Sequence, residues 1–316
     1  MQTTPTATPS QPPVAGANPA LALLRAMRPR QWAKNGMVFL ALVFSVNQYW
    51  SPGDTAQATN LLLRCAATFV LFCMVSSAEY LVNDVLDAPQ DRLHPLKRNR
   101  PIASGALSPV VALAAAVVLA SVSLVGSYLM SPSLGAVVAV YAALMGGYSF
   151  GLKHVVIVDV FIIALGFVLR AGAGAAAIGV PVSPWLYVCT VLGALFLALA
   201  KRRAELTLLQ GDAGSHRRNL EEYTPALVDQ MIGVVAPSAV IAYSLYTFTA
   251  ESLPSNHAMM VTIPFVLYGV FRYLYLVHTR DLGGSPEEVL FSDRPLLGAI
   301  VLWVAVSALV LLAYRG

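Results

Sequence analysis

A cluster of carboxylates at the end of a long apolar segment is the part of this sequence best suited to chemistry. The pattern NDxxDxxxD is formed by Asn83, Asp84, Asp87 and Asp91. On a helix the three aspartates share one face. Like charges repel and charge is costly near hydrocarbon, so this arrangement favours a hard divalent cation that shares its oxygen ligands with phosphates. We therefore expect a Mg²⁺–diphosphate site at a membrane surface, with these four residues as ligands and the three aspartates as the catalytic groups.

Cationic side chains follow the aspartates closely. Four of them lie within nine residues of Asp91, in the stretch from Arg92 to Arg100, and Lys34 opens the first apolar segment. Lysine and arginine side chains bind phosphate oxygens, arginine through paired contacts and lysine as a point charge. The residues of this first group expected to bind substrate are Lys34, Asn83, Arg92, Lys97 and Arg100.

Composition places the chain in a membrane. Of its 316 residues 57% are hydrophobic and only 11% charged, against about 25% charged in soluble domains. The apolar runs are continuous rather than alternating, which favours helices over a β-barrel. We predict an all-α, polytopic protein with nine spans, at approximately 32–50, 57–84, 109–130, 133–150, 155–178, 183–205, 225–249, 258–278 and 294–314.

The basic residues of the short loops gather on one side of these spans. By the positive-inside rule the N-terminus is cytoplasmic and the C-terminus external, with the aspartates facing the cytoplasm. We expect a multi-pass protein of the cell inner (plasma) membrane. Residues 1–24, whose first part is rich in Thr, Pro and Ala, are expected to form a disordered cytoplasmic tail, and residues 25–316 a single nine-helix catalytic domain.

A second basic group lies at the cytoplasmic end of the sixth span, in the run Lys201-Arg202-Arg203-Ala204-Glu205. Fixed cations at this position suit a substrate with more phosphate than a single diphosphate. A simple positive-inside anchor is the alternative explanation of this run. The residues of this second group expected to contact substrate are Tyr148, Lys153, Lys201, Arg202 and Glu205.

Two further charged residues lie in the fifth span. Asp159 and Arg170 are eleven residues apart, about 16 Å along a helix, which is too far for direct pairing. Asp159 is a candidate to hold a ribose hydroxyl. Arg170 lies deep in the membrane and needs a partner or a wet cavity, and we expect Glu79 to be that partner. A buried structural pair and a ligand role remain equal alternatives for Arg170.

Three stretches of this chain resemble the intramembrane UbiA prenyltransferase superfamily: RPRQWAKN at 28–35, NDVLDAPQD at 83–91 and HPLKRNRPIASG at 94–105. The resemblance covers roughly residues 25–316. It implies a nine-helix bundle around a large central cavity that opens laterally to lipid, and a diphosphate held through Mg²⁺ by aspartates on two helices. The chain departs from that family where the second motif, DxxxD, is replaced by the basic run at 201–205.

One branch of the superfamily fits this departure, and residues 148–154, 159–174 and 197–206 are similar to it. In that branch phosphoribosyl diphosphate is the donor and a polyprenyl (decaprenyl) phosphate the acceptor, for cell-wall arabinan precursor synthesis. The resemblance implies transfer of 5-phosphoribose with release of diphosphate. The alternatives are a conventional prenyltransferase with an aromatic acceptor, and a transporter or flippase. Charge clustered at one face rather than at the midplane disfavours transport.

Other sites and partners are disfavoured by the sequence. The five histidines have no zinc spacing, and we find neither a phosphate-binding glycine loop nor a nucleic-acid signature. Expected partners are the two substrates and membrane phospholipids. The small-residue run Ala171–Gly174 could pack helices within one subunit or between subunits, so a homo-oligomer stays open.

Overall fold

The computed structural model describes residues 18–94, 97–209, 222–279, 289 and 292–314. Within these ranges the chain is helical, with one isolated bridge between Val46 and Trp50. The α-helices are α1 (Pro19–Ala26), α2 (Leu40–Phe44), α3 (Thr55–Asp91), α4 (Pro109–Met130), α5 (Pro132–Phe150), α6 (Val158–Ile178), α7 (Pro184–Leu209), α8 (Pro225–Thr249), α9 (Ile263–Thr279) and α11 (Arg294–Tyr314). The 3₁₀ helices are η1 (Pro29–Phe39), η2 (Lys97–Asn99), η3 (Leu152–His154) and η5 (Ala258–Thr262).

Seven helices in the described ranges are long and apolar enough to cross a membrane: α3, α4, α5, α6, α8, η5 with α9, and α11. The predicted all-α membrane class is therefore confirmed. The two remaining predicted spans look different. Residues 32–50 fall on η1 and the short α2 rather than on one regular helix, and 183–205 fall within α7, which carries the basic run at its end.

Helix α1 corrects the expected tail. Residues 19–24 were predicted to be disordered, yet they belong to this helix. Asn18 caps its first turn by accepting from the backbone N–H of Ala20, and Ala22 and Ala26 pack against α3 and α4. An N-cap and an apolar stripe that packs against other helices are enough to order a short helix. Residues 1–17 lie outside the described part of the chain.

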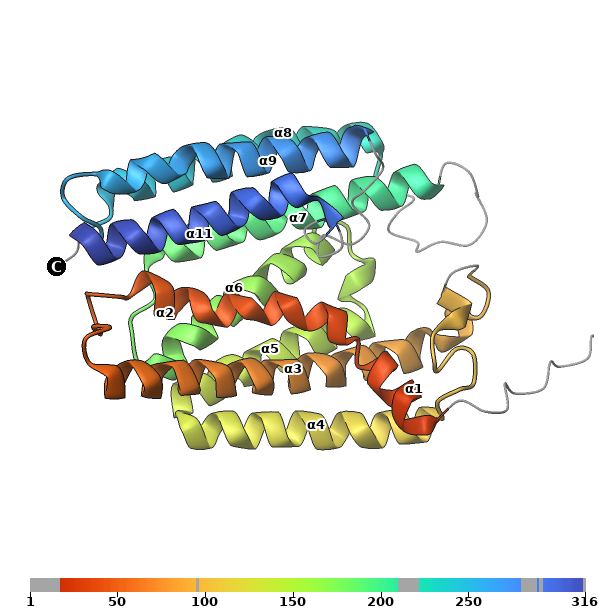
Figure 1. Ribbon diagram of the computed structural model, residues 1–316. Coiled ribbons are helices and arrows are strands. Elements are labelled where there is room, and N and C mark those ends of the chain that lie inside the picture. Colours follow the sequence, from red (N-terminus) through yellow and green to blue (C-terminus); the bar gives the residue numbers. More distant parts are fainter. Residues whose placement is uncertain (1–17, 95–96, 210–221, 280–288, 290–291, 315–316) are drawn as a thin grey trace, which may run out of the picture.

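The helices form two groups, which Figure 1 shows as a lower layer of α1 to α6 and an upper layer of α7 to α11. The first group has a core around Val38, Phe72 and Tyr141. The second has a core around Leu199 and Leu276, and α6 contributes to both. The long helix α3 runs the length of the lower layer and carries the aspartate motif at its C-terminal end.

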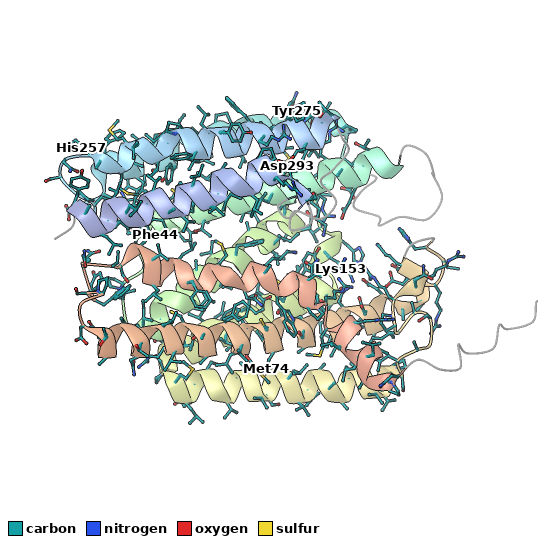
Figure 2. All side chains as sticks on the ribbon, viewed as in Figure 1. Phe44, Met74, Lys153, His257, Tyr275 and Asp293 are labelled. Carbon is teal, nitrogen blue, oxygen red and sulfur yellow. The ribbon has the colours of Figure 1, made fainter. Side chains whose placement is uncertain are left out.

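A cavity of about 1000 Å³ lies between the two groups. Its wall is mostly aromatic and aliphatic, and the aromatic side chains include Phe44, Phe167, Trp185, Tyr246 and Trp303. The cavity therefore suits an apolar ligand. Several polar residues of its wall, among them Gln48 and Glu251, belong to loops at the end of the bundle opposite the aspartates. Figure 2 shows these two ends, with His257 at one and Lys153 at the other.

Candidate functional site

The four residues of the NDxxDxxxD motif all lie on α3, as the spacing predicted, and this helix continues beyond the predicted span 57–84 to Asp91. The side chains of Asp84 and Asp91 are almost completely buried, at 2% and 4% exposure. Buried carboxylates need cationic or hydrogen-bonding partners. The structure supplies these partners from three other segments.

Asp84 and Asp91 converge on one guanidinium. Arg100 Nη1 lies 3.2 Å from Asp84 Oδ1 and 2.7 Å from Asp91 Oδ2. Arg28 Nη2 also contacts Asp84 Oδ1, at 2.5 Å, while its guanidinium covers the ring of Tyr80. Arg28 adopts the left-handed backbone region at φ 55°, in the turn between α1 and η1. A non-glycine residue in this region indicates that the surroundings fix its position.

Asp87 has a separate partner. Lys153 Nζ, from η3, lies 2.5 Å from Asp87 Oδ1 and donates to Asn83 Oδ1 at 3.2 Å. Asn83 Nδ2 donates to Asp87 Oδ2 at 3.0 Å. Lys153 is itself 4% exposed, so its ammonium group is held inside the protein rather than in solvent. Three carboxylates of α3 thus face three cations, and their formal charges balance.

The donor set of this cluster fits Mg²⁺. The available groups are carboxylate and amide oxygens, which are the ligands that hard cations prefer. Asp84 and Asp91 already approach a common point, where Arg100 now lies. In the described part of the chain no three carboxylate, imidazole or thiol groups stand ready around one position. Joint coordination by all three aspartates therefore requires them to rotate away from their cations.

The second basic group divides into a buried member and an accessible one. Arg202 is 1% exposed, and its Nε lies 2.8 Å from Asp159 Oδ2, which is fully buried. Arg202 also pairs with Glu205, and its Nη2 donates to Tyr148 Oη at 3.5 Å. The charge of Arg202 is therefore neutralised within the protein. In this structure Arg202 and Asp159 thus bind each other, and their expected contacts with a substrate phosphate and a ribose hydroxyl stay predictions.

Tyr223 completes that buried cluster. Its hydroxyl donates to Asp159 Oδ1 at 2.8 Å and accepts from the backbone N–H of Ile157 at 2.7 Å. Burial raises the pKa of Tyr223 to about 12, so the phenol stays protonated and can donate. Ile157 has φ 70°, which is strained for a β-branched residue, and the tyrosine holds this turn in place. Tyr223 thus links the Asp159–Arg202 pair to the turn at Ile157.

Lys201 remains as the accessible cation of the run. Its side chain is 38% exposed, and its Nζ lies 4.0 Å from Glu205 Oε1, a weak pair. Lys34 lies close enough for the two ammonium groups to repel each other, although it also donates to Gln31 Oε1 at 2.5 Å. Lys34 and Lys201 therefore come from opposite helix groups to the same end of the bundle.

Arg170 does not pair with Glu79, contrary to the sequence-based expectation. Its Nε donates to Asn35 Oδ1 at 2.8 Å and its Nη2 to Tyr141 Oη at 2.6 Å. The guanidinium also stacks over the rings of Tyr141 and Phe167. Neutral acceptors and aromatic faces solvate this deep cation, so Arg170 joins η1 to α5 and α6.

The loop after α3 carries three of the basic residues that were expected to bind substrate. Arg92 is exposed, and its Nε donates to the backbone oxygen of Ala103 at 3.2 Å. Lys97 is half-buried in η2, and its backbone N–H donates to His94 Nδ1. Arg100, from the same loop, contacts both Asp84 and Asp91.

Sequence reasoning missed Arg28, Asn35 and Tyr223. Arg28 and Asn35 lie in the same motif that supplied Lys34, so the segment was recognised but these two members were not singled out. The turn geometry at Arg28, which aims its side chain at Asp84, leaves no mark in the sequence. Tyr223 lies between two helices and carries no local signal.

Comparison of the sequence with known proteins identifies the family of this chain. The model of the UbiA prenyltransferase family matches residues 37–292. The chain belongs to this family. It is 35% identical over 296 residues to the decaprenyl-phosphate phosphoribosyltransferase of Mycobacterium tuberculosis, covering 94% of this chain and 95% of the relative. It is 36% identical over 299 residues to the enzyme of that name from Corynebacterium glutamicum, covering 93% and 87%.

Among solved structures the chain resembles a UbiA homologue from Archaeoglobus fulgidus that was determined with DMAPP and Mg²⁺ bound. The TM-score is 0.68 and the identity 18%, with 92% of this chain and 99% of the other covered. At this identity the likeness concerns the fold. It confirms the predicted UbiA-like helical bundle.

Proposed function

We propose that this protein transfers 5-phosphoribose from phosphoribosyl diphosphate to a polyprenyl phosphate such as decaprenyl phosphate, releasing diphosphate. The observation that carries this proposal is the electrostatic make-up of the site. Asp84, Asp87 and Asp91 meet Arg28, Arg100 and Lys153, while Lys34 and Lys201 add positive charge at the same end. The relatives named above, similar over almost the whole chain, bear the name of this activity.

The cations of the site suit a reaction that develops negative charge on a leaving group. The bond between ribose C1 and the diphosphate oxygen breaks, and its electron pair leaves with the diphosphate. An oxygen of the lipid phosphate forms the new bond to C1 from the opposite face. Arg100 and Lys153 can stabilise the departing diphosphate, as fixed cations do in other phosphate-transfer sites. The attacking phosphate is already anionic, so no general base is needed.

Mg²⁺ is proposed as the cofactor. Asp84, Asp87 and Asp91, with Asn83, would hold it, and it would supply further neutralisation of the diphosphate charge. Once a cation occupies the aspartates, Arg28, Arg100 and Lys153 are free to turn toward the diphosphate. The ion pairs thus keep these side chains at the site before substrate binds.

Lys34 and Lys201 distinguish this proposal from conventional prenyl transfer. A prenyl diphosphate and an aromatic acceptor bring one diphosphate to the site. Phosphoribosyl diphosphate and a lipid phosphate bring two further phosphate groups, and the proximity of the two lysines supports the proposal that they bind these groups. The lipid chain of the acceptor would occupy the apolar cavity between the two helix groups. We propose a cytoplasmic site in the plasma membrane, because phosphorylated sugars are made inside the cell.

The test is incubation of the purified protein with radiolabelled phosphoribosyl diphosphate, a polyprenyl phosphate and Mg²⁺. Label should enter the organic phase. It should be lost with EDTA and fall by at least about 100-fold in Asp84→Asn, which removes one charged ligand. Asp54→Asn is the matched control: it lies on the same helix at the far end, where it accepts from Gln57 N–H, and asparagine caps equally well.

Absence of organic-phase label with the wild-type protein would overturn the proposal. Consumption of a labelled prenyl diphosphate in the same preparation would instead establish conventional prenyl transfer. Turnover by detergent-purified protein, without any gradient, would exclude the transporter alternative.

A further inference from the structure

A carboxylate for which the described part of the chain supplies no partner lies one helical turn before the aspartate motif on α3. Glu79 precedes Asn83 by four residues and Asp87 by eight on α3, so the three side chains form one stripe along the helix. Each step along this stripe is about 6 Å. Because α3 runs from Thr55 to Asp91, Glu79 lies one helical turn closer to the centre of the bundle than Asn83.

The side chain of Glu79 is half-buried, and it makes no hydrogen bond or ion pair with any residue that the structure describes. Tyr141 lies near enough for their charges to interact, but its hydroxyl already accepts from Arg170. Arg170 in turn is satisfied by Asn35 and by aromatic faces. Glu79 is thus not a member of the structural network beside it. Its oxygens are not among the fully enclosed unpartnered atoms of the described residues, so a ligand inside the bundle can reach them and supply hydrogen-bond donors.

The position of Glu79 relative to Lys153 identifies that ligand. Lys153 contacts both Asn83 and Asp87, and this is the level at which the diphosphate is expected. A sugar ring attached to that diphosphate and pointing into the bundle reaches the level one turn deeper. A carboxyl group has two oxygens, which can take hydrogen bonds from two adjacent hydroxyls.

We propose that Glu79 binds the ribose hydroxyls of the donor and thereby selects a sugar diphosphate over a prenyl diphosphate. This inference rests on the proposed function and adds a specificity residue to it. A prenyl group has no hydroxyl, so its binding would leave the carboxylate buried against an apolar chain. Sites that bind a substrate hydroxyl reject analogues lacking it for this reason.

The experiment compares Glu79→Gln with the wild-type protein in the phosphoribosyl transfer assay. The KM for phosphoribosyl diphosphate should rise about 10- to 100-fold, the range for hydrogen bonds to a charged group. Inhibition by inorganic diphosphate, which has no hydroxyls, should change less than about twofold because it depends on the level above. Asp54→Asn, an acid-to-amide change on the same helix, should leave both values unchanged.

Three outcomes separate the possibilities. An unchanged KM in Glu79→Gln would overturn the assignment while leaving the proposed function intact. A variant with a lowered melting temperature, and equal weakening of substrate and diphosphate binding, would also overturn it by showing that Glu79 supports the fold around Tyr141 and Arg170. A wild-type protein that transfers no phosphoribose would refute the proposed function itself, whatever the variant does.

Discussion

Charged side chains that are neighbours in the sequence can have very different environments in this protein. Lys201 and Arg202 are adjacent and chemically alike, yet one is 38% and the other 1% exposed. Helix geometry turns consecutive residues about 100° apart, so one faces the open end of the site and the other the interior. The buried residue is paired with Asp159, and breaking a buried pair is more costly than losing a surface one.

Replacing Lys201 and Arg202 by methionine, one at a time, should separate an effect on substrate binding from an effect on stability. Arg202→Met should destabilise the protein by about 3–5 kcal/mol, because Asp159 is left buried and unpaired. The melting temperature in detergent measures this loss, and adding Asp159→Asn should restore part of it. Lys201→Met should keep the melting temperature and raise the KM of a phosphorylated substrate about 10-fold or more. A normal KM in Lys201→Met would contradict the proposed contact.

At the scale of elements, the packing of η1 against α6 decides where the first-segment residues point. Gly174 is the contact: a Cβ there would lie 1.9 Å from the backbone oxygen of Val38. Such close approach is possible only without a side chain. The small-residue run that left an oligomer open from sequence therefore packs, at Gly174, within one subunit. The same contact holds η1 beside the bundle and so places Lys34 and Asn35.

Gly174→Ala should push η1 away from α6, at a cost of about 1–3 kcal/mol for the overpacked site. We expect a lower melting temperature and weaker donor binding together, because η1 carries cationic groups of the site. Gly172→Ala is the matched control on the same helix, since nothing lies within 4 Å of its Cβ position. Equal melting temperatures and equal donor binding in the two variants would show that the contact between Gly174 and Val38 does not hold η1 in place.

At the scale of the whole molecule, a charged end and an apolar cavity are separate. Under the proposed function the phosphate groups bind at the charged end and the lipid chain lies in the cavity. Gly193 and Gly269 line the cavity, and each has open space where a Cβ would lie. Gly193→Leu or Gly269→Leu should raise the KM for a long polyprenyl phosphate severalfold and leave that for phosphoribosyl diphosphate unchanged. Gly233→Leu, on the exposed face of α8, is the control. Unaltered KM values for the polyprenyl phosphate would show that its lipid chain does not bind in this cavity.

Orientation is a second property of the whole molecule. Ser104 and Ser255 are both exposed. Ser104 lies in the loop that follows the aspartate motif, and Ser255 lies two residues before His257, which Figure 2 shows at the other end of the bundle. In a variant with alanine at the three native cysteines, a membrane-impermeant maleimide should label Ser255→Cys in intact cells. Ser104→Cys should react only after permeabilisation, because we propose that the basic end faces the cytoplasm. The reverse pattern would invert the proposed topology.

The sequence by itself determined the membrane class, the spans and the aspartate motif, because hydropathy and helical spacing are local properties of the chain. It also identified most segments that build the site. Only the tertiary structure decided which cation meets which carboxylate. Arg28 and Asp84 are 56 positions apart, and Lys153 and Asp87 are 66. Such pairings depend on how helices pack, which is also why the sequence assigned Arg170 to Glu79 and did not pair Arg202 with Asp159.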